Sequence, residues 1–557
     1  MSTTDGNDLV FLPLGGVGEI GMNMGLYGYG PPRNRQWIMV DCGLTFGNAA
    51  ETPGVDLIFP DIQFALGLKQ NLLGLIITHG HEDHFGAVLD LWPKLNIPLI
   101  ATPFTANLLA AKSAGEKRGP QLPVQVVSPS GKIELGPFNI EFVPVAHSIP
   151  EANALAIRTP AGLVVHTGDW KMDKKSHHFG VTDESLFRAL GEEGVIAVIG
   201  DSTNATSDGH SQSEADVLEG ISEQIRSAPA RVAVTTFASH IPRIRTVAEA
   251  AVSVGREIVV VGRAMERTVM AARETGWLDG VPEFRSPDVF GYLPPDKALL
   301  LLTGSQGEQR AALARIANDD HPEISLSRGD RVIFSSRTIP GNEREVNKII
   351  NALIDLGIEV VTDRDAMVHV SGHPRRGDLE ELYTWLKPLA VVPVHGEAMH
   401  LHEHEKLVRK MGIPFVGRVR NGKMLRLAPG APEVIAEVPA GRLYKDGDLV
   451  MASDEPLRQR RRLAFAGVAS VAIAIDQKGE IAGDPEIELS GFPEKDAEGE
   501  KFDDIVHDAV LDALESLPRP KRRDPVFVAD VLRRAIRAEI NACWGKKPVC
   551  HVLVVAL

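Results

Sequence analysis

Cysteine is scarce in this chain, which contains only Cys42, Cys543 and Cys550 among 557 residues. So few cysteines argue against a disulfide framework and favour a reducing compartment. The opening segment MSTTDGNDLV has neither the basic start nor the apolar run of a signal peptide. No stretch approaches the roughly 18 uninterrupted apolar residues of a membrane span. These absences predict a cytoplasmic protein without a membrane partner.

Basic residues are also fewer than acidic ones. The chain has 59 lysines and arginines against 74 aspartates and glutamates, which gives a formal net charge of −15. This balance argues against a protein that coats nucleic acid by releasing counterions. It still allows an enzyme whose metal ions supply positive charge inside a cleft. The 18 histidines are more informative, because several of them lie in short motifs.

The length of the chain predicts two to four domains. In residues 1–212, short apolar runs alternate with turns, which is typical of strands buried on both faces with helices packed over them. Residues 213–366 alternate strands with helices, as βαβ units do. The run VVPV before His395 repeats the first pattern, so we expect residues 367–430 to return to the first domain. The second domain would then be an insertion.

The last part of the chain differs in composition. Residues 431–463 are rich in proline, glycine and charge, and we interpret them as a linker. Residues 464–557 combine strand-like ends with amphipathic helical segments, which predicts a small α+β domain.

The strongest chemical signal is the segment THGHEDH (78–84), directly after an apolar strand. Imidazoles and carboxylates packed this closely are costly to desolvate unless they are used, and both are common zinc ligands. In a loop, His79 and His81 can project to one side while Asp83 and His84 turn toward a neighbouring point. That arrangement suits two metal ions better than one. The alternative is a solvated histidine-rich loop.

Matching residues elsewhere weaken that alternative. His147, Asp169 and His395 each follow a predicted strand, and ligands gather at strand ends in layered α/β folds. With the THGHEDH segment they supply five histidines and two aspartates. This is a suitable inventory for two adjacent zinc sites that share one carboxylate. A pair of metal ions suits displacement at phosphorus, because it activates a hydroxide and neutralises developing charge.

With these motifs the sequence resembles the metallo-β-lactamase fold, its nucleic-acid-cutting β-CASP branch and, within that branch, ribonuclease J. The resemblance covers nearly the whole chain and rests on these segments: LGGVGEIGMN (14–23), VDCGLTF (40–46), ITHGHEDH (77–84), HSIPEAN (147–153), TGDWKMD (167–173), GDSTNAT (200–206), TTFASHI (235–241), GSQGE (304–308), FSSRTIPGNE (334–343), HVSGH (369–373) and PVHGE (393–397). It implies an α/β fold, namely an αββα metallo-β-lactamase sandwich with an inserted α/β β-CASP domain and a small α+β C-terminal domain.

The resemblance also implies roles for the metal-centre residues. Two Zn²⁺ ions per chain, with Mn²⁺ or Mg²⁺ as possible substitutes, would be held as follows: one by His79, His81 and His147, the other by Asp83, His84 and His395, with Asp169 bridging them. Asp41 would accept a hydrogen bond from a ligand histidine and fix its tautomer. Asp201 would support the site where the β-CASP domain begins.

In the HVSGH segment the resemblance implies a grip on the scissile phosphate by Ser371, Gly372 and His373. His373 would protonate the leaving 3′ oxygen, a task that suits the pKa of imidazole. His373 and Asp83 are the two residues predicted to be catalytic. His369 is counted with this RNA-binding segment, although a bracing role fits it better.

The glycines that flank Ser305 favour an anion nest. The resemblance implies that such a pocket receives the 5′ phosphate of RNA, with Ser305 and Arg337 as the candidate residues. Phe46 and Phe237 are candidates for stacking on bases. Burial in a core would explain either aromatic equally well.

The expected function is therefore metal-dependent hydrolysis of single-stranded RNA by a hydroxide that bridges two zinc ions. The resemblance implies 5′-to-3′ exonuclease action on 5′-monophosphate ends, with possible internal cutting, in RNA processing and decay. It also implies a homodimer or higher oligomer formed through the C-terminal domain, and possible RNA-decay partners. Two alternatives remain: a hydrolase of the same fold acting on DNA, an ester or a lactam, and a non-catalytic RNA-decay scaffold.

Overall fold

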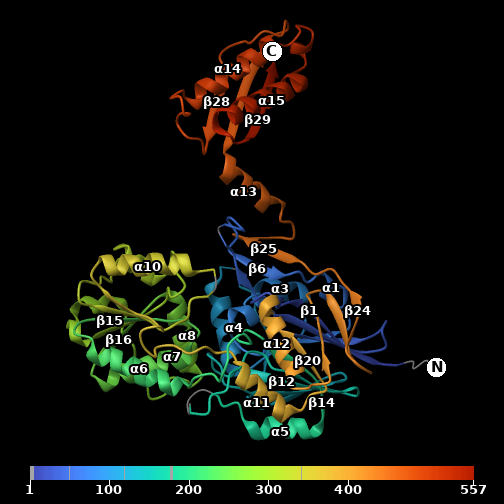
Figure 1. The fold of residues 1–557 in the computed structure, drawn as a ribbon, viewed down its shortest axis with the longest axis vertical. Coiled ribbons are helices and arrows are strands. Elements are labelled where there is room, and N and C mark those ends of the chain that lie inside the picture. The colour runs from blue at the N-terminus through green and yellow to red at the C-terminus, as the bar shows by residue number, and fades with distance from the viewer. Residues whose placement is uncertain (1–5, 49, 118, 176–179, 340) are drawn as a thin grey trace. The chain divides into compact units, whose positions relative to one another are not determined.

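The structure is a computed structural model that describes residues 6–48, 50–117, 119–175, 180–339 and 341–557 (Figure 1). Contacts divide the chain into two compact units. One consists of Met1–Thr45 with Phe59–Arg442, and the other of Phe46–Ile58 with Leu443–Leu557.

Two mixed sheets face each other in the larger unit. Their strand orders are β24-β23-β1-β3-β4-β7-β8-β9 and β10-β11-β12-β13-β14-β20-β22. Apolar side chains from both sheets, such as Ile76, Ile157 and Val392, form one core between them. The strand β1 is buried at every position, as its uninterrupted apolar run predicts.

The strands of the first sheet are β1 (Asp8–Gly15), β3 (Met24–Gly30), β4 (Gln36–Val40), β7 (Leu72–Ile76), β8 (Leu99–Ala101), β9 (Val124–Val126), β23 (Lys423–Ala428) and β24 (Glu433–Glu437). Those of the second are β10 (Lys132–Leu135), β11 (Phe138–Pro144), β12 (Asn153–Thr159), β13 (Gly162–His166), β14 (Val195–Asp201), β20 (Ala390–Val394) and β22 (Phe415–Val416). The accompanying helices are α1 (Gln63–Gly67), α2 (Glu82–Phe85), α3 (Val88–Leu95), α4 (Pro103–Gly115), α5 (Glu184–Glu193), α11 (Arg376–Leu386) and α12 (Ala398–Lys410).

The segment from α6 to β19, which lies between β14 and β20 in the sequence, forms a separate α/β layer. Its strands are all parallel, in the order β16-β17-β15-β18-β19, and Figure 1 shows α10 on one side of them with α6 and α7 on the other. Its elements are α6 (Glu214–Ser227), β15 (Val232–Thr235), α7 (Ile241–Ser253), β16 (Glu257–Val261), α8 (Arg263–Glu274), β17 (Ala298–Leu302), α9 (Ala312–Ala317), β18 (Arg331–Phe334), α10 (Glu343–Asp355) and β19 (Glu359–Val361). After this layer, β20 pairs in parallel with β14. The chain therefore returns to the first sandwich, and the expected insertion is confirmed.

The smaller unit contains the sheet β28-β27-β29, whose apolar face packs against two helices around Val471, Val510 and Ile536. These elements are β27 (Val468–Ile475), β28 (Glu486–Ser490), α14 (Phe502–Glu515), α15 (Pro525–Trp544) and β29 (Val549–Ala556). The expected α+β character is confirmed. The stretch interpreted as a linker contains regular structure: β24, β25 (Arg442–Asp446), β26 (Leu449–Met451) and most of α13 (Glu455–Ala466). The residue limits given for each domain remain a prediction.

Candidate metal centre

The motif residues gather where several strands of the two sheets end. His79 and His81 lie in the turn after β7, and Asp83 and His84 lie in the short helix α2 that follows. The other three follow strands of the second sheet: His147 after β11, Asp169 after β13 and His395 directly after β20. The structure brings all seven together in two groups that share Asp169. Within each group, the potential ligand atoms lie within 4.8 Å of one another.

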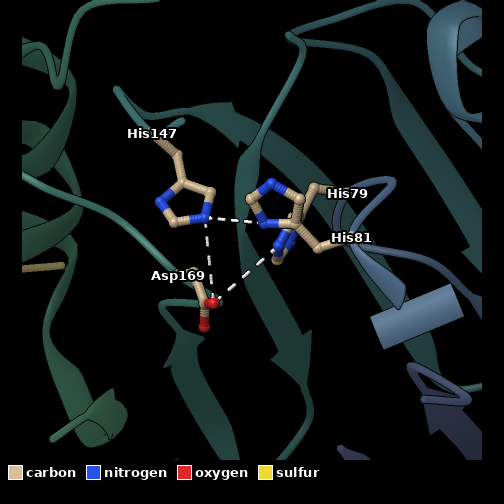
Figure 2. Close-up of side chains that lie close together, drawn as sticks. All are labelled: His79, His81, His147 and Asp169. Atoms are coloured by element: carbon tan, nitrogen blue, oxygen red, sulfur yellow. Dashed lines mark hydrogen bonds and ion pairs between the residues drawn. The ribbon is translucent and has the colours of Figure 1, made fainter. Parts of the chain in front are cut away.

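The first group consists of three histidines and Asp169 (Figure 2). Nε2 of His79 and Nε2 of His147 each lie 3.8 Å from Oδ2 of Asp169. Nδ1 of His81 lies 3.0 Å from Nε2 of His147. Figure 2 shows the imidazole nitrogens pointing toward a common point beside the carboxylate. The geometry suits one cation bound by three imidazoles and a carboxylate oxygen.

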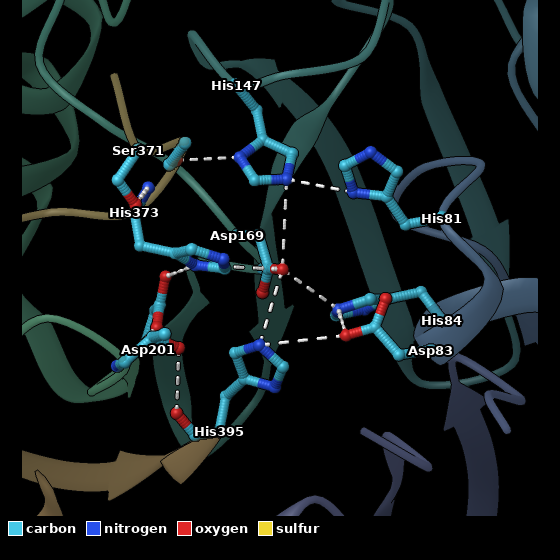
Figure 3. A network of polar contacts seen from close by, with 12 residues as sticks. His81, Asp83, His84, His147, Asp169, Asp201, Ser371, His373 and His395 are labelled. Atoms are coloured by element: carbon cyan, nitrogen blue, oxygen red, sulfur yellow. Dashed lines mark hydrogen bonds and ion pairs between the residues drawn. The ribbon is translucent and has the colours of Figure 1, made fainter. Parts of the chain in front are cut away.

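The second group lies on the other side of Asp169 (Figure 3). Oδ2 of Asp169 is 3.2 Å from Nε2 of His84 and 3.4 Å from Nε2 of His395. The Asp83 carboxylate completes the group, at 3.6 Å from His84 and 3.8 Å from His395. The same oxygen of Asp169 therefore faces both groups.

The electrostatics of the centre suit cations. Burial lowers the pKa of His79 and His147 well below the ordinary value and that of His81 to about 4, so these rings are neutral and able to bind a cation. Although burial opposes its charge, Asp169 has a pKa well below the ordinary value because His395 and His84 face it. Burial also disfavours the charged form of His84, but the carboxylates of Asp169, Asp83 and Asp41 raise the pKa of that ring. Within the described part of the chain, Nε2 of His79, Nε2 of His395 and Oδ1 of Asp169 are buried without a hydrogen-bond partner. Buried polar atoms left this way fit ligands of a metal ion.

Hydrogen bonds from outside the groups orient the rings. Asp41 accepts from Nδ1 of His84 at 2.7 Å, as expected for a carboxylate that fixes a ligand tautomer. The same carboxylate accepts from the hydroxyl and the backbone N–H of Thr78, and that hydroxyl lies 3.0 Å from Nδ1 of His79. Both rings therefore present Nε2 toward Asp169.

Asn23 is a site residue that sequence reasoning missed. Its Oδ1 accepts from Nδ1 of His395 at 3.0 Å, and its Nδ2 lies 3.1 Å from Nε2 of His84 and from the carbonyl of Asp83. Asn23 thus contacts every residue of the second group except Asp169. The only available signal was its position at the end of the motif LGGVGEIGMN.

The HVSGH loop (residues 369–373) lies beside the first group. The carbonyl of Gly372 accepts from Nδ1 of His147 at 2.7 Å, so the loop orients a ring of the metal centre. A Cβ at Gly372 would lie 2.8 Å from the His147 ring, which explains why glycine occupies this position. Nδ1 of His373 donates to Asp201 at 2.8 Å and lies 3.9 Å from Asp169. Burial opposes charge on His373, but Asp201 and Asp169 raise the pKa of the ring to about 9.

The hydroxyl of Ser371 accepts from Nδ2 of Asn204 at 2.8 Å, so the loop is also braced by the segment that follows β14. His369 is half-buried, and its Nδ1 lies 3.5 Å from the Arg243 guanidinium, which suits the bracing role.

The residues expected around a 5′ phosphate lie in two adjoining loops. Ser305 is buried, Arg337 is exposed, and Gln306 joins the two loops through the Arg337 carbonyl and the backbone N–H of Ile339. Gln306 was not expected from the sequence. Of the two aromatic candidates, Phe46 is 65% exposed, which removes the core explanation for it, and Phe237 is half-buried.

Known families match most of the chain. The matching models are described as Beta-lactamase superfamily domain (36–215), Ribonuclease J, beta-CASP domain (229–353), Zn-dependent metallo-hydrolase RNA specificity domain (357–416) and Ribonuclease J C-terminal domain (456–557). A Ribonuclease J from Sinorhizobium meliloti is 54% identical over 548 residues, which cover 98% of this chain and 97% of the relative. The chain belongs to the ribonuclease J family. It is a zinc-dependent metallo-hydrolase that cleaves RNA.

More distant members of the ribonuclease J family also align along almost the whole chain. Ribonuclease J from Corynebacterium glutamicum is 37% identical over 99% of this chain and 76% of its own length. That from Mycolicibacterium smegmatis is 35% identical over 98% and 96%. A solved structure of a protein of unknown function from Enterococcus faecalis shares the fold, with a TM-score of 0.53 at 16% identity over 75% of this chain and 100% of that one. Among the residues described for this ribonuclease J, helices long and apolar enough to cross a membrane are absent.

Proposed function

We propose that this ribonuclease works with two divalent cations, zinc in the first place, with manganese or magnesium as substitutes. His79, His81 and His147 would hold one ion, Asp83, His84 and His395 the other, and Asp169 both. The observation that supports this most directly is the shared carboxylate, whose Oδ2 faces both groups. When bound, such ions activate water as a nucleophile near neutral pH and neutralise charge on the phosphate.

The side chains of the HVSGH loop would handle the leaving group. Asp201 holds Nδ1 of His373, which leaves Nε2 to donate a proton to the 3′ oxygen as the P–O3′ bond breaks. In the described contacts Ser371 uses its oxygen as an acceptor, so its proton can be donated to a phosphate oxygen. Breaking the P–O3′ bond leaves a 3′ hydroxyl on the departing upstream fragment and a 5′ phosphate on the downstream RNA.

We also propose that the enzyme degrades RNA from a 5′-monophosphate end, in the 5′-to-3′ direction, with internal cutting as a second activity. The buried Ser305 and the exposed Arg337, in loops joined by Gln306, are candidates for the terminal phosphate. Phe46 and Phe237 are candidates for stacking on bases, a role that the high exposure of Phe46 supports.

One RNA sequence with a 5′ triphosphate, monophosphate or hydroxyl tests this directly, with the products mapped at both ends. We expect mononucleotides with 5′ phosphates to be released fastest from the monophosphate form. Equal rates from all three ends would refute the end preference. Replacing Asp83 and His84 by alanine together should abolish cleavage, whereas unchanged turnover would refute the metal assignment.

The proposal also covers the oligomeric state, the partners and the location of the enzyme. We propose a homodimer or higher oligomer formed through the C-terminal domain (464–557), which acts in the cytoplasm together with other RNA-decay proteins. Exposed apolar side chains on β29 and directly after it support self-association, namely Leu553, Val555 and Leu557. Light scattering of the full chain and of a Leu553→Glu variant tests it, because a monomer in both cases would contradict the proposal.

A further inference from the structure

The HVSGH loop is held at its start by a residue outside the loop. The carbonyl of Val368, directly before the loop, accepts a hydrogen bond from Nη1 of Arg243 at 2.9 Å and another from the hydroxyl of Ser335 at 2.7 Å. Nη1 of Arg243 also donates to that hydroxyl at 2.6 Å. Arg243 lies in the first turn of α7, and Ser335 directly follows β18, so both belong to the inserted layer.

The Arg243 guanidinium is completely buried, with 0% of the side chain exposed. On its other side it pairs with the carboxylate of Glu214, through Nε at 3.1 Å and Nη2 at 3.0 Å. The planar guanidinium of arginine binds a carboxylate through two nitrogens while a third donates to a carbonyl, and an ammonium group lacks this rigid, bidentate geometry. Arg243 therefore joins the start of the loop to the first residue of α6.

Glu214 extends this connection toward the metal centre. Its backbone N–H donates to Asp173 at 3.0 Å, and Asp173 pairs with Nζ of Lys171 at 3.2 Å. Lys171 lies two residues after Asp169, and its own backbone N–H donates to the carbonyl of Ala146, next to His147. Side chains of Arg243, Glu214, Asp173 and Lys171 thus link the segments that carry Asp169 and His147 to the start of the HVSGH loop.

Among the described residues, the network contains two cations, Arg243 and Lys171, and two carboxylates, Glu214 and Asp173. His240 accepts from the backbone N–H of Arg243 through Nδ1, so its proton is on Nε2, 3.5 Å from Glu214. Burying ionic groups is unfavourable unless they are paired and hydrogen-bonded. Because hydrophobic residues can replace such pairs without loss of stability, a role in specifying geometry is a reasonable inference.

We propose that Arg243 is a positioning residue for RNA cleavage, which fixes the HVSGH loop relative to the metal centre, with Glu214 as its anchor. The inference rests on the proposed function in one respect, the role of His373 as proton donor. Arg243 contacts Val368, directly before the loop, and His369, the first residue of the loop, and its effect on the reaction passes through the backbone to His373. A displacement of the loop by about 1 Å is enough to reduce a rate roughly 10²-fold.

Two variants separate positioning from stability. Arg243→Lys keeps a positive charge beside Glu214 but lacks the planar guanidinium that binds Glu214 and Val368 together. Arg243→Met combined with Glu214→Gln removes both charges, so no unpaired charge is left in the core. Arg256→Met is the matched control, because Arg256 is also a buried arginine of the inserted layer and donates to the carbonyls of Ala228, Ala230 and Ala298, away from the loop.

The measurements are kcat and KM for 5′-monophosphate RNA, zinc content, the melting temperature, and hydrolysis of bis(p-nitrophenyl) phosphate. The last substrate has a leaving group that needs no proton. We expect kcat for RNA to fall about 10²-fold in Arg243→Lys and in the double variant, with KM, zinc content and hydrolysis of the small diester nearly unchanged. Arg256→Met should keep the wild-type kcat for RNA, whatever its melting temperature.

A double variant that is folded, zinc-loaded and as fast on RNA as the wild type would overturn the proposal. A parallel loss of zinc, diester hydrolysis and RNA cleavage would also overturn it, because it would show a general structural role. Different results would show that the proposed function itself is wrong. In that case the wild type cleaves no RNA, or His373→Ala retains the wild-type kcat, and both results are independent of Arg243.

Discussion

Asp41 offers the sharpest test of how the metal centre is organised. Its Oδ1 accepts from the backbone N–H of Thr78 at 2.8 Å, and its Oδ2 accepts from Nδ1 of His84 at 2.7 Å. In Asp41→Asn the backbone N–H requires the amide oxygen on the Thr78 side, so the NH₂ group faces His84. Two donors cannot share a hydrogen bond, and His84 must move its proton to Nε2. That nitrogen faces Asp169 and is then unable to bind a cation.

The expected loss is specific to the group that contains His84. Disturbing an outer partner of a metal ligand lowers metal affinity or activity about 10- to 100-fold. This corresponds to about 1.4 to 2.8 kcal/mol of binding free energy. Asn tolerates the left-handed backbone that Asp41 adopts, with φ of 64°, so the substitution should not disturb the main chain. Competition with a zinc chelator measures the affinity of each site, and RNA cleavage at saturating zinc measures the remaining activity.

The result that would refute this reasoning is a variant in which both metal sites keep their affinity within about twofold, below the smallest expected effect. Asp61→Asn is the matched control, because the Asp61 carboxylate accepts from the backbone N–H of Gln63 rather than from an imidazole. It should bind zinc and cleave RNA like the wild type. A loss in both variants would point to a general effect of the lost charge.

Three further outcomes follow from the structure. Gly372→Ala would place a Cβ 2.8 Å from the His147 ring, so zinc content and RNA cleavage should fall together; normal zinc binding would contradict the contact. Although burial opposes its charge, Glu214 has a pKa well below the ordinary value because Arg243 and Lys171 face it. The stabilising effect of the Glu214 carboxylate should be complete above about pH 4.5 and should fade at lower pH. In urea unfolding, Glu214→Gln should therefore be less stable than the wild type by about 3 to 5 kcal/mol at pH 7 and by a smaller amount near pH 3. A difference that stays constant with pH would disprove this role of Glu214. Dialysis against EDTA should abolish RNA cleavage and lower the melting temperature, and added zinc should restore both; a nuclease that stays active without metal would rule out the centre.

The sequence predicted the residues that converge on the metal centre, because each of them is marked by its own position along the chain. His147, Asp169 and His395 all stand after apolar runs, and the two sheets bring those strand ends together. The insertion was predicted for the same reason, since the run before His395 repeats the pattern of the first domain and β20 pairs with β14.

Residues whose role depends on a distant partner were missed. Asn23 contacts His395 across 372 positions of sequence, and Arg243 contacts Val368 across 125. Apart from the position of Asn23 at the end of the motif LGGVGEIGMN, neither has a local signal that distinguishes it from an ordinary turn or helix residue. The stretch 431–463 illustrates the same limit. Its proline, glycine and charge indicate a linker, yet β24 forms because β23 offers it a partner.

A chain with a net negative charge can still bind RNA if positive charge is concentrated at the metal centre. Two divalent ions, as proposed, would face two ligand carboxylates, Asp83 and Asp169, which leaves about two positive charges at the centre. Imidazoles that bind the ions would add no charge of their own. Phosphate is therefore attracted to one buried point, while the surplus of 15 negative charges over the whole chain disfavours unspecific binding of nucleic acid elsewhere. An enzyme organised this way holds RNA where it can be cut, and the HVSGH loop determines whether the bound phosphate is correctly placed.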